Sequence, residues 1–312
     1  MRWLALGAML AGCAELGVVS DGTSISVGKA SHGYLLEGVR LPDRGDGYTT
    51  RDVWRARDQR FGTDELVDLV VGVARRMGRQ VPDVKLVVAD LSGRGGGERA
   101  AFHRSHQSGR DADLLYYMRD ASGQPLEPDA MHVFNAGGRA TDGTGITIDV
   151  PRTWLLVREI ITAPEAAVQW VFMYEPIAWR LIEHAQRIGE PEALIARARR
   201  TLRQPGDSAR HDDHMHVRVY CATADRAYGC VDLGPMELLA ERQAEPSPSA
   251  ALMDALASAA SSPAATPGPP SPIGGSAGAA SLAPSAAALA VPPRLGRLLR
   301  THTDRITLPR WR

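Results

Sequence analysis

The segment from His211 to Tyr220 constrains the fold more than any other part of the chain. In its second half polar and apolar residues alternate strictly, with His214, His216 and Arg218 at every second position and hydrophobic residues between them. Successive side chains of a β-strand point to opposite faces, so this pattern predicts a strand with one buried face and one polar face. Two imidazoles therefore project together from the same side of one strand.

A second group of histidines lies earlier in the chain. Of the nine histidines, five fall in two short segments, and the earlier segment contains His103 and His106, followed by Asp113. Neutral imidazole and carboxylate are the ligands that zinc takes in catalytic sites, where one position stays open for water. The clustering therefore predicts a metal site that both segments share, whereas surface or core histidines without a metal are the alternative.

The N-terminus has the pattern of a bacterial lipoprotein signal. Residues 1–13 contain an apolar run at 3–10, too short to span a bilayer, and end in a Leu-Ala-Gly-Cys tetrapeptide at Cys13. We expect a signal peptide whose lipobox makes Cys13 the acylated first mature residue; an ordinary cleaved signal is the alternative. Without Cys13 an even pair remains, Cys221 and Cys230, which in an exported chain predicts a disulfide rather than two free thiols.

Composition divides the rest of the chain into three parts. Residues 24–239 have the composition of a folded domain, and residues 245–293 are dominated by Ala, Ser, Pro and Gly, which predicts a disordered linker. Residues 294–312 form a basic tail, for which we favour a solvated state over contact with anionic membrane or wall polymer. Because basic and acidic residues balance at 36 each, no overall charge attracts the chain to nucleic acid, and we expect no nucleic-acid partner.

Within residues 24–239, strands and helices do not alternate regularly. Capping residues and apolar spacing predict a helix that begins after Thr63, a helix from Asp149 to Ile161 and helical structure over 175–198 with a break near 189–191. Buried strands are expected at 84–88, 112–117 and 168–174. The pattern favours an α+β fold in which a small antiparallel sheet carries the zinc site and helices flank it.

The histidine segments resemble the paired signature of the lysostaphin, D-Ala-D-Ala metallopeptidase and hedgehog superfamily. His106 is followed after six residues by Asp113, and His214-Met215-His216 comes far downstream. Within that superfamily, the strings from Ser105 to Asp113 and from His214 to Arg218 are similar to the penicillin-insensitive murein endopeptidases. The pattern that begins at Ser26-Val27-Gly28 and the cysteine pair also agree, so the resemblance covers residues 24–230.

The resemblance implies roles for the residues of both segments. His106, Asp113 and His216 would bind zinc, with water as the fourth ligand. Zinc lowers the pKa of its bound water to about 7. His214 would be the general base, a role that suits an imidazole because its ordinary pKa of about 6.5 is close to working pH. His211 would steady the oxyanion or protonate the leaving amine.

Three other residues have open assignments. His103 would orient a ligand or bind a second metal, with a solvent-facing side chain as the alternative. Asp149 would have either of the same two roles, but we favour a helix N-cap. Asp111 is expected on the strand face of Asp113, where it would support a ligand or replace one.

The resemblance implies an endopeptidase that hydrolyses the D-Ala-diaminopimelate crosslinks of peptidoglycan with zinc-activated water. We expect the protein in the periplasm, held at the outer membrane by its lipid anchor. A D-Ala-D-Ala carboxypeptidase or dipeptidase is one alternative, and a non-catalytic, hedgehog-like zinc-containing wall-binding module is another. The presence of His211 and His214 argues against the non-catalytic module. The residues alone imply only zinc-assisted amide hydrolysis.

Overall fold

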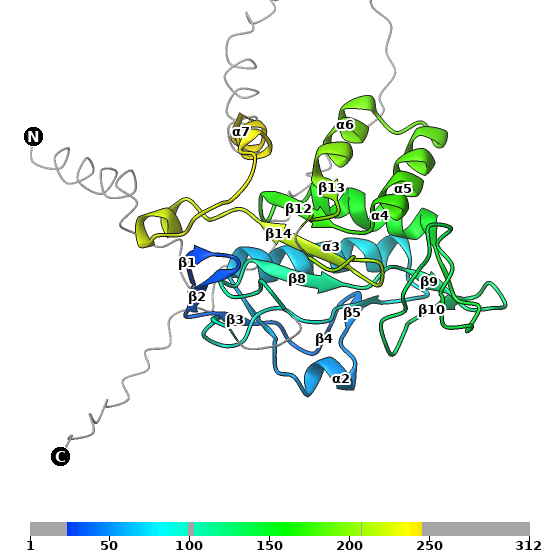
Figure 1. Cartoon of the computed structure of the whole chain (residues 1–312), viewed down its shortest axis with the longest axis horizontal. Helices are drawn as coiled ribbons and strands as arrows, with labels where there is room; N and C mark the ends of the chain where they lie inside the picture. The colour runs from blue at the N-terminus through cyan, green and yellow to red at the C-terminus, as the bar shows by residue number, and fades with distance from the viewer. Residues whose placement is uncertain (1–23, 99–102, 207, 245–312) are drawn as a thin grey trace, which may run out of the picture. The chain divides into compact units, whose positions relative to one another are not determined.

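The computed structural model describes residues 24–98, 103–206 and 208–244 (Figure 1). Short sheets and helices follow one another without regular alternation, which confirms the predicted α+β class. The expected signal peptide with Cys13, the linker at 245–293 and the basic tail at 294–312 lie outside the described residues.

A four-stranded sheet positions the histidines. Its order is β13 (Leu202–Arg203), β12 (Val168–Phe172), β14 (Met215–Val219) and β8 (Asp111–Leu114). The pairs β8·β14 and β14·β12 are antiparallel, as expected. The short edge strand β13 pairs with β12 in parallel and was not predicted. The strands expected at 112–117 and 168–174 are therefore found, with shorter limits.

The alternation along β14 divides its two faces as the sequence predicts. Met215 and Val217 are 0% exposed and Val219 is 1% exposed, and all three belong to the hydrophobic core. The opposite face of the strand carries His216 and Arg218. Burial of the apolar face fixes the register of the strand, because a shift by one residue would bury the polar side chains instead.

Helices share the core beneath this sheet. The helices are α2 (Asp52–Arg55), α3 (Asp64–Gln80), α4 (Val150–Ile161), α5 (Glu175–Arg187), α6 (Glu192–Thr201) and α7 (Glu237–Ala244). The predicted N-caps are present, since Thr63 Oγ1 accepts a hydrogen bond from Leu66 N and Asp149 Oδ1 accepts one from Arg152 N. The expected break lies between α5 and α6. No helix of the described residues is long and apolar enough to cross a membrane.

Small strands form the remaining sheets. They are β1 (Ile25–Lys29) with β2 (His32–Leu36); β3 (Val39–Arg40) with β6 (Phe61–Gly62); β4 (Arg44–Gly45), β5 (Tyr48–Thr49) and β7 (Leu86–Val87); and β9 (Met118–Arg119), β10 (Pro125–Leu126) and β11 (Thr147–Ile148). The strand expected at 84–88 is reduced to β7, because its parallel partner β5 has only two residues.

Covalent and polar contacts fasten the β1·β2 hairpin to the segment after β14. Cys221 and Cys230 form the predicted disulfide. Next to it, Gly28 N donates to Gly229 O at 3.0 Å and Val231 N donates to Gly28 O at 2.9 Å. This end of the domain is thereby tied to the segment that directly follows β14, the strand that carries His216.

Candidate metal centre

The register of two neighbouring strands brings the two sequence segments together. In the antiparallel pair of β8 and β14, Asp113 lies opposite His216 and Asp111 lies opposite Arg218. Side chains at directly opposite positions of an antiparallel pair share a face of the sheet. The predicted juxtaposition of Asp113 and His216 is therefore present, and Asp111 shares their face as expected.

His106 reaches the same face from the loop before β8. Its φ of 65° lies in the left-handed region, which residues other than glycine adopt only when their surroundings hold them there. The backbone N of His106 donates to Asp111 Oδ2 at 2.9 Å, and its Nδ1 lies 2.9 Å from Leu91 O. These contacts leave Nε2 directed at Asp113 and His216, so that the ring arrives in one orientation.

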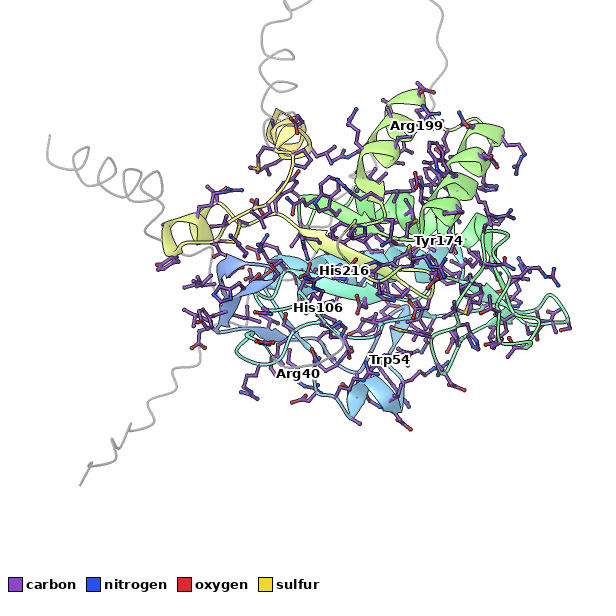
Figure 2. The ribbon with its side chains drawn as sticks, in the orientation of Figure 1. Arg40, Trp54, His106, Tyr174, Arg199 and His216 are labelled. Atoms are coloured by element: carbon purple, nitrogen blue, oxygen red, sulfur yellow. A yellow bond between two sulfur atoms is a disulfide. The ribbon has the colours of Figure 1, made fainter. Side chains whose placement is uncertain are left out.

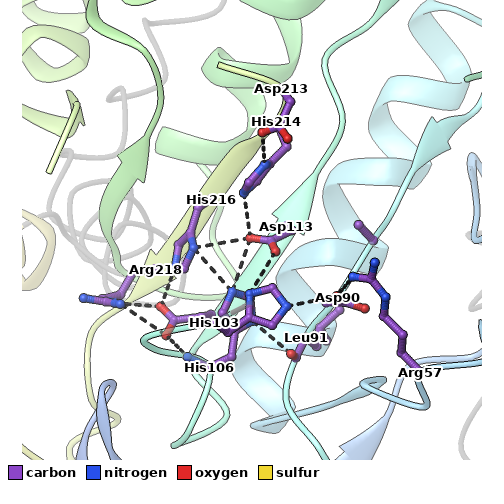
Figure 3. Close-up of polar contacts among 12 residues, drawn as sticks. Arg57, Asp90, Leu91, His103, His106, Asp113, Asp213, His214, His216 and Arg218 are labelled. Atoms are coloured by element: carbon purple, nitrogen blue, oxygen red, sulfur yellow. Dashed lines mark hydrogen bonds and ion pairs between the residues drawn. The ribbon is translucent and has the colours of Figure 1, made fainter. Parts of the chain in front are cut away.

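Three imidazoles converge on one carboxylate oxygen (Figure 3). Asp113 Oδ1 lies 3.3 Å from His106 Nε2, 3.3 Å from His216 Nδ1 and 3.3 Å from His214 Nε2. His106 Nε2 and His216 Nδ1 are also 3.3 Å apart. His106 and His216 lie next to each other near the centre of the domain in Figure 2, with their ring centres 4.6 Å apart. The two residues and Asp113 are almost fully buried.

The donor set fits a divalent metal ion. Although nitrogen atoms surround Asp113, neither of its buried oxygens has a hydrogen-bond partner with acceptable geometry among the described residues. A buried carboxylate without hydrogen bonds costs several kcal/mol unless another partner compensates its charge. A cation bound by this oxygen and the facing imidazole nitrogens supplies that compensation, and the ligand types are those that zinc prefers.

A second group of possible ligands overlaps the first. His103, His106 and Asp113 form one cluster that could hold a metal ion, and His211, His214 and His216 form another. His103 Nδ1 lies 3.8 Å from Asp113 Oδ2, and its Nε2 lies 2.9 Å from Asp90 Oδ2. The side chain of His103 is therefore directed into the site by a buried carboxylate and is not solvent-facing.

Buried charges hold the pKa values of the two aspartates low. Burial raises the pKa of Asp111, but the charges of Arg218 and His216 outweigh burial and hold it well below its usual value. Burial likewise raises the pKa of Asp113, and the charges of His106 and His214 outweigh burial and bring it well below the usual range. Both carboxylates are therefore ionised, the form in which a carboxylate binds metal.

His214 and His211 have opposite electrostatic surroundings. Burial lowers the pKa of His214, yet the charge of Asp113 and the hydrogen bond to Asp213 raise it to about 10. Burial and the neighbouring charges of His216 and His214 lower the pKa of His211 to about 3. The pKa values of these two imidazoles, whose rings are 5.2 Å apart, are therefore shifted in opposite directions.

Backbone contacts fix the turn that carries His211. Its N donates to Gln204 Oε1 at 3.0 Å, and its O accepts from Tyr116 Oη at 3.0 Å and from Tyr174 N at 2.8 Å. Nδ1 of His211 is buried without a hydrogen-bond partner among the described residues. The turn is therefore held on three sides, and an imidazole with an unused nitrogen faces the site.

Asp149 lies apart from this cluster. Its carboxylate caps α4 and forms ion pairs with Arg119 at 2.8 Å and Arg152 at 3.3 Å. It belongs to neither of the two groups of possible metal ligands found among the described residues. The favoured expectation for Asp149, a helix cap, is therefore what the structure shows.

Four supporting groups were not predicted from the sequence. Asp90 contacts His103, the carbonyl of Leu91 contacts His106, and Asp213 Oδ1 lies 2.6 Å from His214 Nδ1. Arg218 holds Asp111 through two hydrogen bonds, of 2.6 and 3.2 Å. For Asp213 and Arg218 the sequence offers a signal, since both adjoin the histidine positions of the strand. Asp90 and Leu91 carry no recognisable pattern.

Comparison with known proteins places this geometry in a family. A model of the family described as penicillin-insensitive murein endopeptidase matches residues 26–238. The chain belongs to this family. The matched region contains every strand of the described domain except the first residue of β1, and all of the residues that form the metal centre.

Curated members of the murein endopeptidase family are similar over most of their length. A penicillin-insensitive murein endopeptidase of Haemophilus influenzae is 25% identical over 224 residues, which are 69% of this chain and 70% of the relative. The protein of the same name from Klebsiella pneumoniae is 27% identical over 69% of this chain and 72% of its own. One from Escherichia coli is 27% identical over 233 residues, covering 70% and 77% of the two chains.

Proposed function

We propose that this chain is a zinc-dependent murein endopeptidase that hydrolyses the D-Ala-diaminopimelate crosslinks of peptidoglycan. The observation that carries the proposal is the convergence of His106, His214 and His216 on the buried Asp113 carboxylate, whose oxygens lack hydrogen bonds from the described residues. Family membership supports the choice of murein as substrate, because the relatives carry that activity in their names.

In this proposal His106, Asp113 and His216 hold the zinc ion. Their ring and carboxylate orientations are set by neighbours that do not bind metal, which is typical of such sites. When bound, zinc polarises a carbonyl and allows water to act as a nucleophile near neutral pH. This chemistry is suited to an amide bond, and the donor set leaves room for solvent in a catalytic site.

In this proposal His214 is the general base, and His211 stabilises the oxyanion or acts as the general acid. Asp213 holds Nδ1 of His214 at 2.6 Å, so that Nε2 faces the site. The charge of Asp113 is what raises the pKa of His214, and a cation bound by Asp113 would cancel that charge and leave Nε2 able to accept a proton from the attacking water. His211, a neutral imidazole with a free Nδ1, steadies the charge that develops on the carbonyl oxygen or delivers a proton to the leaving amine. Each role follows from the nitrogen that the surrounding contacts leave available.

Purified full-length mature protein with zinc, incubated with crosslinked muropeptide dimers and followed by mass spectrometry, tests this proposal. We expect monomeric peptides from the wild type and none from His214→Ala. Release of a terminal D-Ala without crosslink cleavage would instead indicate the carboxypeptidase alternative. If zinc is bound and no peptide bond is cut, the chain is a wall-binding module and the proposal is wrong.

We further propose that the protein acts in the periplasm, anchored to the outer membrane through a lipid on Cys13. The disulfide between Cys221 and Cys230 supports an oxidising compartment, since such bonds are rare in the cytosol. Mass spectrometry of the N-terminal peptide from membrane fractions tests the anchor. An acylated Cys13 is expected, whereas an unmodified N-terminus produced by cleavage elsewhere would contradict it.

A further inference from the structure

A positively charged hollow lies at the edge strand β13, two strands away from β14. It has a volume of about 400 Å³ and is bounded by α5, the end of α6, β13 and Trp170 of β12. Two indole rings, those of Trp170 and Trp179, contribute to its apolar surface. Three guanidinium groups and only one carboxylate line it, which gives it a positive charge; they belong to Arg199, Arg200, Arg203 and Glu175.

An arginine and a tryptophan of this hollow already contact each other. The guanidinium carbon of Arg203 lies 4.7 Å from the centre of the Trp170 ring, a cation–π distance. Within the described ranges, no carboxylate lies within 4 Å of the Arg203 guanidinium, although Arg199 pairs with Glu192 at 3.3 Å. Trp179 is 53% exposed, which is unusual for the largest apolar side chain. An exposed indole next to an unpaired cation is suited to an anionic ligand.

A continuous row of side chains connects the hollow to the histidines. Across the sheet, Phe172 of β12 lies between Arg203 of β13 and His216 of β14. The Phe172 ring is stacked on Trp170 at 6.0 Å and meets the His216 ring edge-on at 5.4 Å. Arg203, Phe172 and His216 therefore share one face of the sheet, with the edge strand of the hollow two strands away from that of the metal centre.

A second contact links the hollow to the site through Gln204. This residue lines the hollow, and its Oε1 accepts the hydrogen bond from the backbone N of His211. A ligand in the hollow would therefore contact Gln204, the side chain that holds the turn of His211.

We propose that this hollow binds a carboxylate-bearing stem peptide of peptidoglycan, next to the bond that is cleaved. This inference rests on the proposed function and adds a recognition site to it. Stem peptides carry free carboxylates, which the planar fork of arginine binds through two parallel hydrogen bonds. Arg203 is the principal partner, because its guanidinium already lies over the Trp170 ring and no carboxylate of the described domain is paired with it.

The test measures peptide binding by the full-length zinc-loaded protein in isothermal titration calorimetry. The probe is an uncrosslinked stem tetrapeptide with free carboxylates, compared with the same peptide after amidation. We expect Arg203→Gln to weaken binding of the acidic peptide roughly tenfold, as loss of a charge-assisted contact does, and to raise KM with kcat kept. Amidation should weaken binding to the wild type and change little in Arg203→Gln.

Arg187→Gln is the matched control, because it removes one charge from an exposed arginine of α5 outside the hollow. Equal affinities in the two variants, or equal binding of the acidic and amidated peptides, would overturn the inference. Stronger binding of peptide-free glycan chains, with competition against the tetrapeptide, would overturn it as well, in favour of sugar recognition.

The outcomes also separate this inference from the proposed function. Arg203-dependent peptide binding without crosslink cleavage by the wild type would leave the binding site in place and refute the endopeptidase. Crosslink cleavage with a KM that Arg203→Gln does not change would refute the binding site and leave the endopeptidase in place.

Discussion

Replacing Asp111 by asparagine tests whether metal binding depends on a carboxylate that does not itself face the metal. The Asp111 side chain is fully buried and serves two ligands at once. Its Oδ1 lies 3.0 Å from His216 Nε2 and 2.6 Å from Arg218 Nε, and its Oδ2 accepts from His106 N at 2.9 Å. One side chain therefore lies against the ring of His216 and holds the loop of His106 by a hydrogen bond.

The structure sets the size of the effect of Asp111→Asn. An amide has a single acceptor oxygen, so its NH₂ group must face either His216 Nε2 or the backbone N of His106, and one of these contacts becomes repulsive. Loss of such a supporting partner lowers metal affinity roughly 10- to 100-fold. Because Arg218 also loses its charged partner, we expect the free energy of unfolding to fall by about 2–3 kcal/mol.

Zinc affinity measured by competition with a chromogenic chelator, together with urea denaturation, provides the assay. Asp232→Asn is the matched control, because Asp232 is also a buried carboxylate, lies 2.9 Å from Arg110 and contacts no histidine of the site. The control should lose stability and keep its zinc affinity. If Asp111→Asn binds zinc as tightly as the wild type, the imidazole orientations do not depend on Asp111 and the reasoning is wrong.

Three further predictions address other parts of the molecule. His106→Ala should lose zinc and activity together, whereas His214→Ala should keep zinc, measured by atomic absorption, and lose activity; equal metal loss would mean that ligand and base are misassigned. Removing the disulfide with a Cys221→Ser, Cys230→Ser double substitution should lower the free energy of unfolding by about 2–3 kcal/mol, measured in denaturant, since the bond closes a short loop with a separation of 9. Asp149→Ala should cost about 1–2 kcal/mol of stability as a lost cap and leave the zinc content unchanged; a loss of metal would show that it binds a second ion.

Local patterns predicted the elements that carry the site. The alternation along β14 identified the face of His216 because one buried face forces the polar residues to the other. The helix starts at Thr63 and Asp149 were predicted because their capping side chains act within one turn of the chain. Such features depend on neighbours in sequence, so the sequence alone contains them.

Contacts between distant segments escaped prediction. The edge strand β13 has only two residues, too few for any periodicity, and it pairs because α6 delivers it alongside β12. The Leu91 contact to His106 uses a backbone carbonyl, which every residue possesses and no residue type signals. Asp90 supports His103 from 13 positions earlier in the chain, beyond the reach of any helix or strand periodicity. For Asp111, spacing predicted the correct face, but the partners on that face required the register of β8 against β14.

The wide separation of the ligand segments affects how the protein acquires its metal. His106 and His216 are 110 positions apart, so the complete donor set exists only after the sheet has closed over a long loop. The unfolded chain nevertheless contains two local chelating stretches, one with His103 and His106 and one with His211, His214 and His216. Metal that binds these stretches separately stabilises the unfolded state and reduces the gain from native binding. Refolding yield should therefore be higher when zinc is added after folding than when it is present from the start.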